Sequence, residues 1–92
     1  MRFEFKPSFD RSVKSFLDDE KAEVKSLAIE LVDMLSRDKS ISKGVGLKRL
    51  QGKFWEARKG LKTRILFRWD GELVEFVLVG NHDDVRKFLK TH

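Results

Sequence analysis

The sequence predicts an α+β fold of two layers, in which helices pack on a mainly antiparallel, twisted sheet of about four strands. Apolar residues recur every three or four positions between residues 8 and 37, which is typical of amphipathic helices. Residues 54–79 instead alternate and cluster as β-strands do. The length of 92 residues suffices for one modest core, so we expect a single domain over residues 1–92.

The N-terminal third is expected to contain a short strand and a helical hairpin. Residues 2–6 alternate polar and apolar side chains and are followed by Pro7, as at the end of a short strand. Helices are expected at 8–17 and 19–37, with apolar stripes formed by Phe9, Val13, Phe16 and Leu17, and by Val24, Leu27, Ala28, Leu31, Val32 and Leu35. So short a connection predicts an antiparallel hairpin whose stripes pack into the core.

The second half of the chain is expected to form a loop, three strands and a short helix. Residues 38–52 hold three glycines and no sustained periodicity, which indicates a loop. The Asp70-Gly71 pair is a strong hairpin signal between the last two of three β-rich runs, at 54–59, 63–69 and 72–79. Residues 83–90 are predicted to form the terminal helix, whose first turn carries two aspartates.

The middle strand of this half indicates what each face of the sheet contacts. Successive side chains of a strand point to opposite faces. In the run 63–69, one face carries Ile65, Phe67 and Trp69, and the other carries Arg64, Leu66 and Arg68. We therefore expect one face to pack against the helices and the other to bind something anionic.

Charge is distributed unevenly along the chain, whose net charge is +5. Residues 10–38 carry five cations and eight anions, whereas residues 39–69 carry ten cations and only Glu56 as an anion. Such a one-sided segment in a folded domain is typical of a surface that binds phosphate backbones or an acidic protein partner. The alternative is a solvated, lysine-rich surface that maintains solubility.

The composition argues against several classes of protein. No stretch approaches the roughly 18 uninterrupted apolar residues of a membrane-spanning helix, and the N-terminus lacks the apolar middle of a secretory signal. We therefore expect a cytoplasmic protein with no membrane partner. The chain has no cysteine and only two histidines, which argues against a metal site, and we expect no cofactor.

Four short motifs follow one another along the chain: Leu47 to Gln51, F-W-E-A-R at 54–58, T-R-I-L-F-R-W at 63–69 and V-L-V-G-N-H-D-D at 77–84. In this order they resemble the toxins of the RelE/ParE superfamily, most closely its HigB- and YafQ-like branch. The two predicted helices also lie where that family has them, so the resemblance covers nearly the whole chain. It implies a RelE-like fold.

The resemblance further implies the toxin of a type II toxin–antitoxin system. Such toxins are usually mRNA interferases, endoribonucleases that cleave messenger RNA on the ribosome and so inhibit translation. The implied partners are a cognate antitoxin, the ribosome and mRNA, with operator DNA bound only through the antitoxin complex. Alternatively, the chain is a ParE-like or catalytically inactive relative that inhibits gyrase or the ribosome by binding alone, or a standalone RNA-binding module.

Metal-independent RNA cleavage lets the ribose 2′-hydroxyl attack its own phosphate, which requires a base, a cationic cradle and an acid. From the resemblance, His82 takes the role of the catalytic histidine, and Arg64 that of the arginine that holds the scissile phosphate. Otherwise His82 is a turn histidine with no function, and Arg64 is a cross-strand partner of Glu56 or Glu75. Glu56 and Arg58 point to the same side of their strand, so they form either a salt bridge that positions Arg58 or a carboxylate base beside its cation.

Further cations are expected to contact RNA phosphates without specifying a sequence: Lys48, Arg49, Lys53, Lys59, Lys62, Arg68 and Arg86. Many RelE-like enzymes use a tyrosine near the C-terminus, and this chain has no tyrosine. Phe88 lies near that place and cannot transfer a proton, which leaves His82 as the titratable group for this step. Asp83 or Asp84 either orients the imidazole or serves only to begin the terminal helix.

Overall fold

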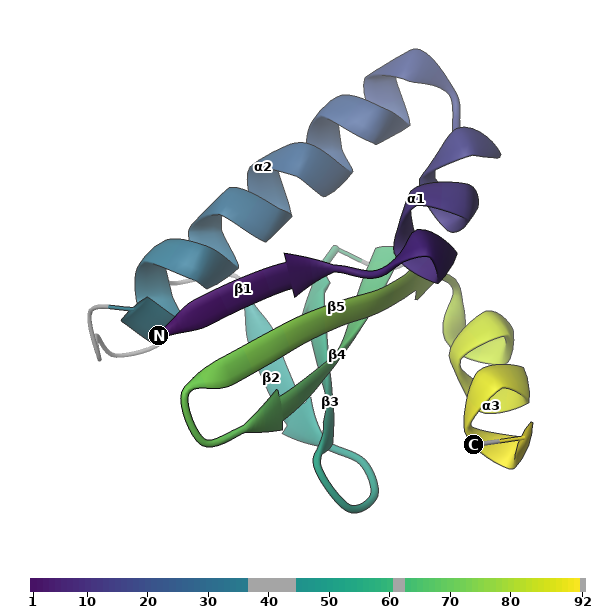
Figure 1. The fold of residues 1–92 in the computed structure, drawn as a ribbon. Helices are drawn as coiled ribbons and strands as arrows, with labels where there is room; N and C mark the ends of the chain where they lie inside the picture. The colour runs from purple at the N-terminus through teal and green to yellow at the C-terminus, as the bar shows by residue number, and fades with distance from the viewer. Residues whose placement is uncertain (37–44, 61–62, 92) are drawn as a thin grey trace.

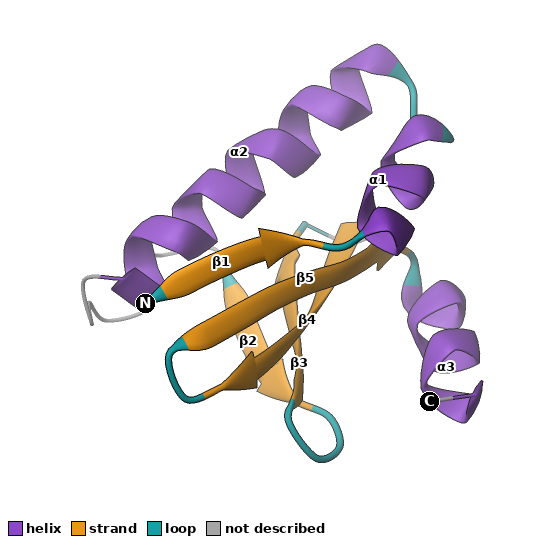
Figure 2. Ribbon diagram, viewed as in Figure 1, coloured by secondary structure: helices purple, strands orange, loops and turns teal. Residues whose placement is uncertain are grey.

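The computed structural model describes residues 1–36, 45–60 and 63–91 and consists of three helices and a five-stranded sheet (Figure 1). The elements follow in the order β1 (Arg2–Phe5), α1 (Pro7–Lys14), α2 (Asp18–Ser36), β2 (Gly46–Arg49), β3 (Phe54–Lys59), β4 (Thr63–Asp70), β5 (Leu73–Gly80) and α3 (His82–Thr91). Figure 2 shows the long α2 crossing above the sheet and α1 and α3 near the end of β5. The predicted α+β class is confirmed.

The strands lie in the order β1-β5-β4-β3-β2. β1 pairs with β5 in parallel, and the other neighbours are antiparallel. The prediction of a loop over 38–52 is wrong for β2, which pairs with β3 and places Leu47 opposite Ala57. Four residues beside glycines carry too little alternation to be recognised as a strand, and β2 depends on β3 for its hydrogen bonds. The rest of the predicted loop before residue 45 lies outside the described residues.

The first helix is shorter than predicted. It begins at Pro7, whose fixed φ suits the first helical turn, and ends at Lys14. Leu17 therefore lies between the helices rather than on an apolar stripe, and it is 69% exposed. Its backbone N–H donates to Oε1 of Glu20, at 2.9 Å, which helps to begin α2.

The main core lies between α2 and one face of the sheet. Ile65 and Phe67 of β4 are fully buried there, and Trp69 packs at the margin, as the alternation predicts. The helices contribute Phe9 from α1 and Val24, Leu27, Ala28, Leu31 and Met34 from α2. No helix among the described residues has the length and apolar character needed to span a lipid bilayer.

The opposite face of the sheet is not reserved for an anionic ligand. Leu66, Val77 and Val85 form a second buried cluster, and α3 adds Phe88 and Leu89 at its edge. Leu66 lies between Arg64 and Arg68 on this face of β4 and is fully buried. The two arginines therefore lie in separate charged regions rather than on one continuous basic surface. The prediction missed this because α3 is short and its apolar residues reveal no docking partner.

Helix α1 replaces a strand along the last part of β5. β1 reaches only to Phe76 in its pairing with β5. Beyond that point the Ser8 hydroxyl donates to the carbonyl of Val77, and the N–H of Val79 donates to the Ser12 hydroxyl at 3.0 Å. Serines four residues apart lie on one side of a helix, so α1 satisfies the backbone of β5 where no strand is present. This arrangement anchors the segment that leads into Gly80 and His82.

Candidate active site

A buried ion pair joins β3 and β4 on the α3 side of the sheet. Nη1 of Arg64 donates to Oε1 of Glu56 at 2.7 Å, and the side chains are 17% and 6% exposed, respectively. A carboxylate so far from water is stable only with a close, hydrogen-bonded cation. Glu56 therefore fixes the guanidinium of Arg64. The sequence left both Arg58 and Arg64 open as partners of Glu56, and the structure pairs it with Arg64 across the strands.

Arg58 lies directly opposite Arg64 in the pairing of β3 with β4. Its exposed side chain runs beside Gly46 of β2, with Nε 3.5 Å from where a β-carbon on Gly46 would lie. Like charges opposite each other on neighbouring strands repel, and Glu56 offsets only one of the two. An anion placed between these arginines would relieve that repulsion. The end of β3 and β4 at which they lie therefore suits a phosphate.

An open groove of about 560 Å³ brings Arg64 and His82 together. Arg64 lies opposite Gly80 in the sheet, and His82 follows two residues later as the first residue of α3. The far wall comes from the junction of α1 and α2, through Phe16 and Glu20. Two of the predicted catalytic residues thus share one cavity, whereas neither Glu56 nor Arg58 lines it.

The position of His82 depends on a reciprocal cap at the start of α3. The N–H of Asn81 donates to Oδ2 of Asp84 at 3.0 Å, and the N–H of Asp84 donates to Oδ1 of Asn81 at 2.9 Å. This is a capping box, in which two residues satisfy each other's free backbone donors. Asp84 thus serves the helix start, one of the two roles that the sequence left open. A β-carbon on Gly80 would lie 2.5 Å from Oδ2 and 2.8 Å from Cβ of Asp84, so this turn requires glycine.

The structure does not bring the other predicted RNA-binding cations together. Lys48 lies opposite Glu56 on the side of the ion pair, and Arg86 is exposed on α3. Lys59 is held to Glu30 of α2 at 2.9 Å, and its neighbour Lys62 lies outside the described residues. Arg49, Lys53 and Arg68 lie at the other end of β3 and β4, by the turn between β2 and β3.

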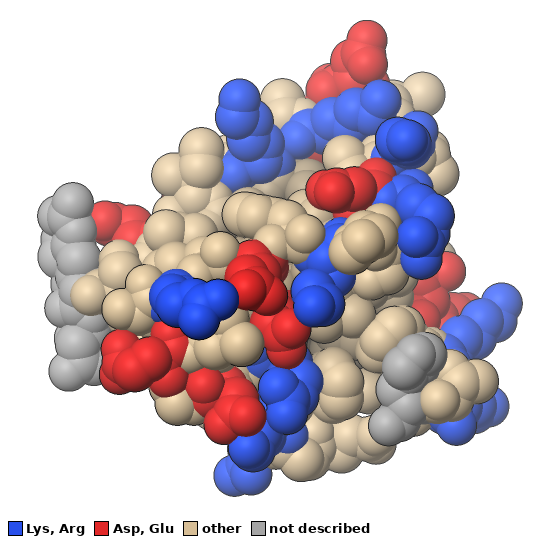
Figure 3. Space-filling model, viewed as in Figure 1, with Lys and Arg blue, Asp and Glu red and all other residues tan. Residues whose placement is uncertain are grey.

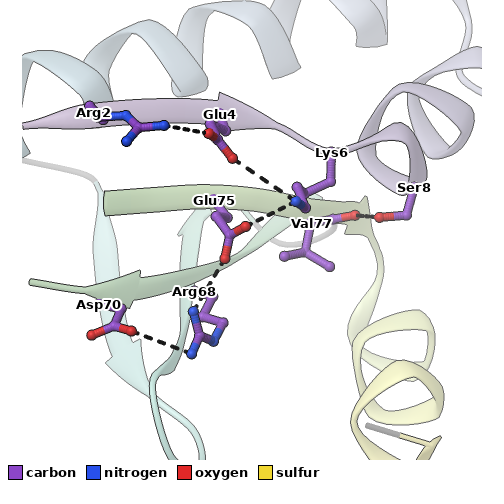
Figure 4. Close-up of polar contacts among 8 residues, drawn as sticks. All are labelled: Arg2, Glu4, Lys6, Ser8, Arg68, Asp70, Glu75 and Val77. Atoms are coloured by element: carbon purple, nitrogen blue, oxygen red, sulfur yellow. Dashed lines mark hydrogen bonds and ion pairs between the residues drawn. The ribbon is translucent and has the colours of Figure 1, made fainter. Parts of the chain in front are cut away.

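A chain of charged contacts crosses β1, β5 and β4 near that other end (Figure 4). Nζ of Lys6 lies 3.0 Å from Glu75, and Nη1 of Arg68 lies 3.3 Å from the same carboxyl group. The hydrogen bond from Lys6 holds the pKa of Glu75 below its usual value, and the same contact raises the pKa of Lys6. Lys53, 2.8 Å away, likewise lowers the pKa of Asp70. Figure 3 shows cations and carboxylates interspersed over this face, so Arg68 belongs to a compensated network.

One feature of the site was left open by the sequence analysis, and another escaped it. The partner of Glu56 was left open, because nothing in local spacing distinguishes a partner two residues away from one on the next strand. No pattern in the sequence indicated that Phe16 and Glu20 form a wall of the groove, because this depends on how the α1–α2 hairpin packs over β5. Among the described residues, no group of three histidine, aspartate or glutamate side chains is placed to hold a metal ion.

No protein-family model matches the chain, and no curated protein matches it. Solved structures do resemble it. A metal-bound toxin from Helicobacter pylori has a TM-score of 0.70 and 17% identity, covering 92% of this chain and 98% of that one. A YafQ mutant from E. coli has a TM-score of 0.71 and 14% identity, covering 90% and 94%. The RelBE2 toxin–antitoxin complex from Mycobacterium tuberculosis has a TM-score of 0.62 and 20% identity, covering 88% and 96%.

These likenesses show a shared fold. The RelE-like architecture that the four sequence motifs implied is therefore confirmed.

Proposed function

From this shared fold, we propose that the protein is the toxin of a type II toxin–antitoxin system and that it cleaves messenger RNA on the ribosome. The observation that carries the proposal is the groove in which Arg64, oriented by buried Glu56, lies with His82. A fixed cation beside an imidazole supplies two of the parts that cleavage by a 2′-hydroxyl requires, a cationic site for the phosphate and a group that transfers a proton.

In the proposed reaction, the 2′-oxygen bonds to phosphorus while the bond from phosphorus to the 5′-oxygen breaks. The 2′-hydroxyl loses a proton and the 5′-oxygen gains one. Arg64 and Arg58 stabilise the extra negative charge on the phosphorane, because charge-assisted hydrogen bonds strengthen as that charge develops. His82 transfers one of the two protons, and a group of the ribosomal RNA or a water molecule transfers the other, because the chain has no tyrosine. Lys48 and Arg86 bind the RNA backbone on either side.

Glu56 acts in this proposal as a positioning residue. Its side chain is 6% exposed and one carboxylate oxygen accepts from Arg64 at 2.7 Å, which leaves little access for a ribose hydroxyl. Its role is to hold the guanidinium in one orientation, so that no reorganisation is needed as the transition state forms.

The proposal includes a cognate antitoxin. One of the similar structures is a toxin–antitoxin complex, which supports such a partner for a chain of the same fold. Co-expression with the neighbouring reading frame should relieve growth arrest. If no neighbouring product neutralises the protein, this pairing is wrong.

The test is primer extension on a message translated in a purified bacterial system. Wild-type protein is compared with His82→Ala, Arg64→Ala and the control Lys25→Ala, an exposed cation of α2 outside the groove. Codon-phased cuts that require ribosomes, disappear in the first two variants and persist in the control are expected. Intact message with arrested translation would replace the nuclease by an inhibitor that acts through binding alone. Intact message with normal translation would direct attention to gyrase.

A further inference from the structure

The groove that holds Arg64 and His82 continues into a longer depression between α1 and α3. A second cavity of about 260 Å³ shares Phe16 and Asp84 with it. A third, of about 680 Å³, shares Ser12, Leu78 and Phe88 with the second. Figure 1 shows α1 and α3 near the end of β5, which forms the floor. We name the second and third cavities together the α1–α3 trench.

The trench is long enough to hold an extended chain. Its floor follows β5 from Glu75 to Gly80, where the candidate active site begins. At about 3.3 Å per residue, this stretch of strand spans roughly 17 Å. A ligand in the trench would therefore reach the site of Arg64 and His82 without leaving the surface.

The walls of the trench carry cations with no partner among the described residues. Arg11 of α1 lines the third cavity and Lys87 of α3 lines the second, and both side chains are exposed. The two carboxylates that line these cavities are already engaged, because Glu75 pairs with Lys6 and Arg68, and Asp84 belongs to the capping box. The potential along the trench is therefore positive, and its available charges lie at two points along its length.

The trench also presents aromatic surface. Phe54 and Phe88 are half-buried and line the third cavity, with ring centroids 6.0 Å apart in an edge-to-face arrangement. Phenylalanine faces stack on unpaired bases of any identity, with about 1–3 kcal/mol for each base. Cations along a groove with aromatic side chains in its floor are the features by which proteins bind single strands.

We propose that the α1–α3 trench binds the single-stranded RNA that extends from the scissile phosphate. Arg11 and Lys87 contact successive phosphates, and a base enters the third cavity against Phe54 and Phe88. This inference rests on the proposed function, because it takes the RNA strand to be bound at Arg64 and His82. An acidic peptide would also suit the cations, but the uninterrupted connection to the groove of Arg64 favours the RNA strand.

The test measures the binding of fluorescein-labelled 2′-O-methyl oligoribonucleotides, from dinucleotides to decanucleotides, by fluorescence anisotropy. The methyl group blocks the attacking oxygen, so binding is read without cleavage or ribosomes. For the wild type, affinity should rise with length until the trench is filled. In the double variant Arg11→Ala/Lys87→Ala, long oligomers should bind about tenfold more weakly, and the salt dependence of log K should flatten by about 0.7 for each cation removed. The shortest oligomers should bind as they do to the wild type.

The matched control is Lys21→Ala/Lys25→Ala, which removes two cations from α2 outside the trench and should bind every length as the wild type does. If the wild type binds all lengths with equal affinity, or if the double variant binds like the wild type, the proposal that RNA occupies the trench is wrong. The proposed function then survives if Arg64→Ala weakens every length. Failure of the wild type to bind any oligomer would overturn the binding of RNA in the trench, whereas the ribosome-dependent activity would still be tested by primer extension. If the double variant binds RNA as the wild type does but no longer binds a synthetic Glu/Leu amphipathic peptide that the wild type binds, the trench is a binding site for a protein partner.

Discussion

Oε1 of Glu56 accepts a 2.7 Å hydrogen bond from Nη1 of Arg64 on the neighbouring strand, in a position where the carboxylate is almost excluded from water. Removing one member of such a pair leaves the other without compensation. We expect Glu56→Gln to lower the free energy of unfolding by about 1–3 kcal/mol, since a neutral amide replaces the charged acceptor. Urea denaturation of Glu56→Gln, Arg64→Gln and the double variant forms a double-mutant cycle. Additive losses would show that the two side chains do not interact.

The same ion pair gives a prediction for activity. If Glu56 positions Arg64, then Glu56→Gln and Glu56→Asp should both reduce the rate of cleavage, because each alters how the guanidinium is held. A general base would behave differently, since Glu56→Gln would remove an ionisation from the pH–rate profile. The profile of Glu56→Gln is therefore expected to keep the shape of the wild type at a lower rate. Loss of one limb would instead assign Glu56 to proton transfer.

Gly80 and Asp84 approach too closely to admit a side chain at residue 80. We expect Gly80→Ala to destabilise the protein by about 1–2 kcal/mol, because the new β-carbon displaces the Asp84 carboxylate from its cap. The matched control is Gly46→Ala, where the added carbon would lie 3.5 Å from Nε of Arg58, an ordinary contact. Thermal unfolding measures both. The cost of Gly80→Ala should shrink in an Asp84→Ala background, and an undiminished cost would place the strain elsewhere.

The hydroxyl of Ser12 is the acceptor for the N–H of Val79 on β5. Ser12→Ala should lower the free energy of unfolding by about 1–3 kcal/mol, because a buried donor loses its partner. It should also accelerate hydrogen exchange at Val79. Ser36→Ala is the control, since that hydroxyl donates to carbonyls of its own helix. Unchanged exchange at Val79 would mean that water or another group replaces the serine.

The contact of Lys6 with Glu75 predicts how stability depends on pH. The pKa of Glu75 is lowered in the folded state, so its contribution is present above the unfolded value near 4.5 and is lost as the pH falls through the folded value. The pKa of Lys6 is raised above 10.5, so its contribution is complete below that value and is lost as the pH rises through the folded one.

Glu75→Gln should therefore flatten the pH dependence of unfolding at both the acid and the alkaline end. Urea midpoints across the pH range measure this. A variant whose profile matches that of the wild type would show that the contact contributes nothing to stability.

Local patterns in the sequence determined the strand and helix assignments well. β3 was predicted with its observed bounds, Phe54–Lys59, and the start of α2 to within a residue, because alternation and apolar spacing are properties of neighbouring residues. The predicted end of α2 at residue 37 lies outside the described residues. The faces of β4 follow from the same alternation. The order of four motifs was enough to imply the RelE-like fold, which the similar solved structures share.

Contacts between distant segments were decided only by the tertiary structure. Glu56 had candidate partners in the sequence, and the register of β3 against β4 selected Arg64. β2 exists as a strand because β3 supplies its hydrogen bonds, and the groove of His82 exists because the α1–α2 junction lies over the end of β5. Each of these depends on which surfaces bury one another best, a property of the whole packed chain. The sequence alone therefore predicted the candidate groups, and the packing determined which of them meet.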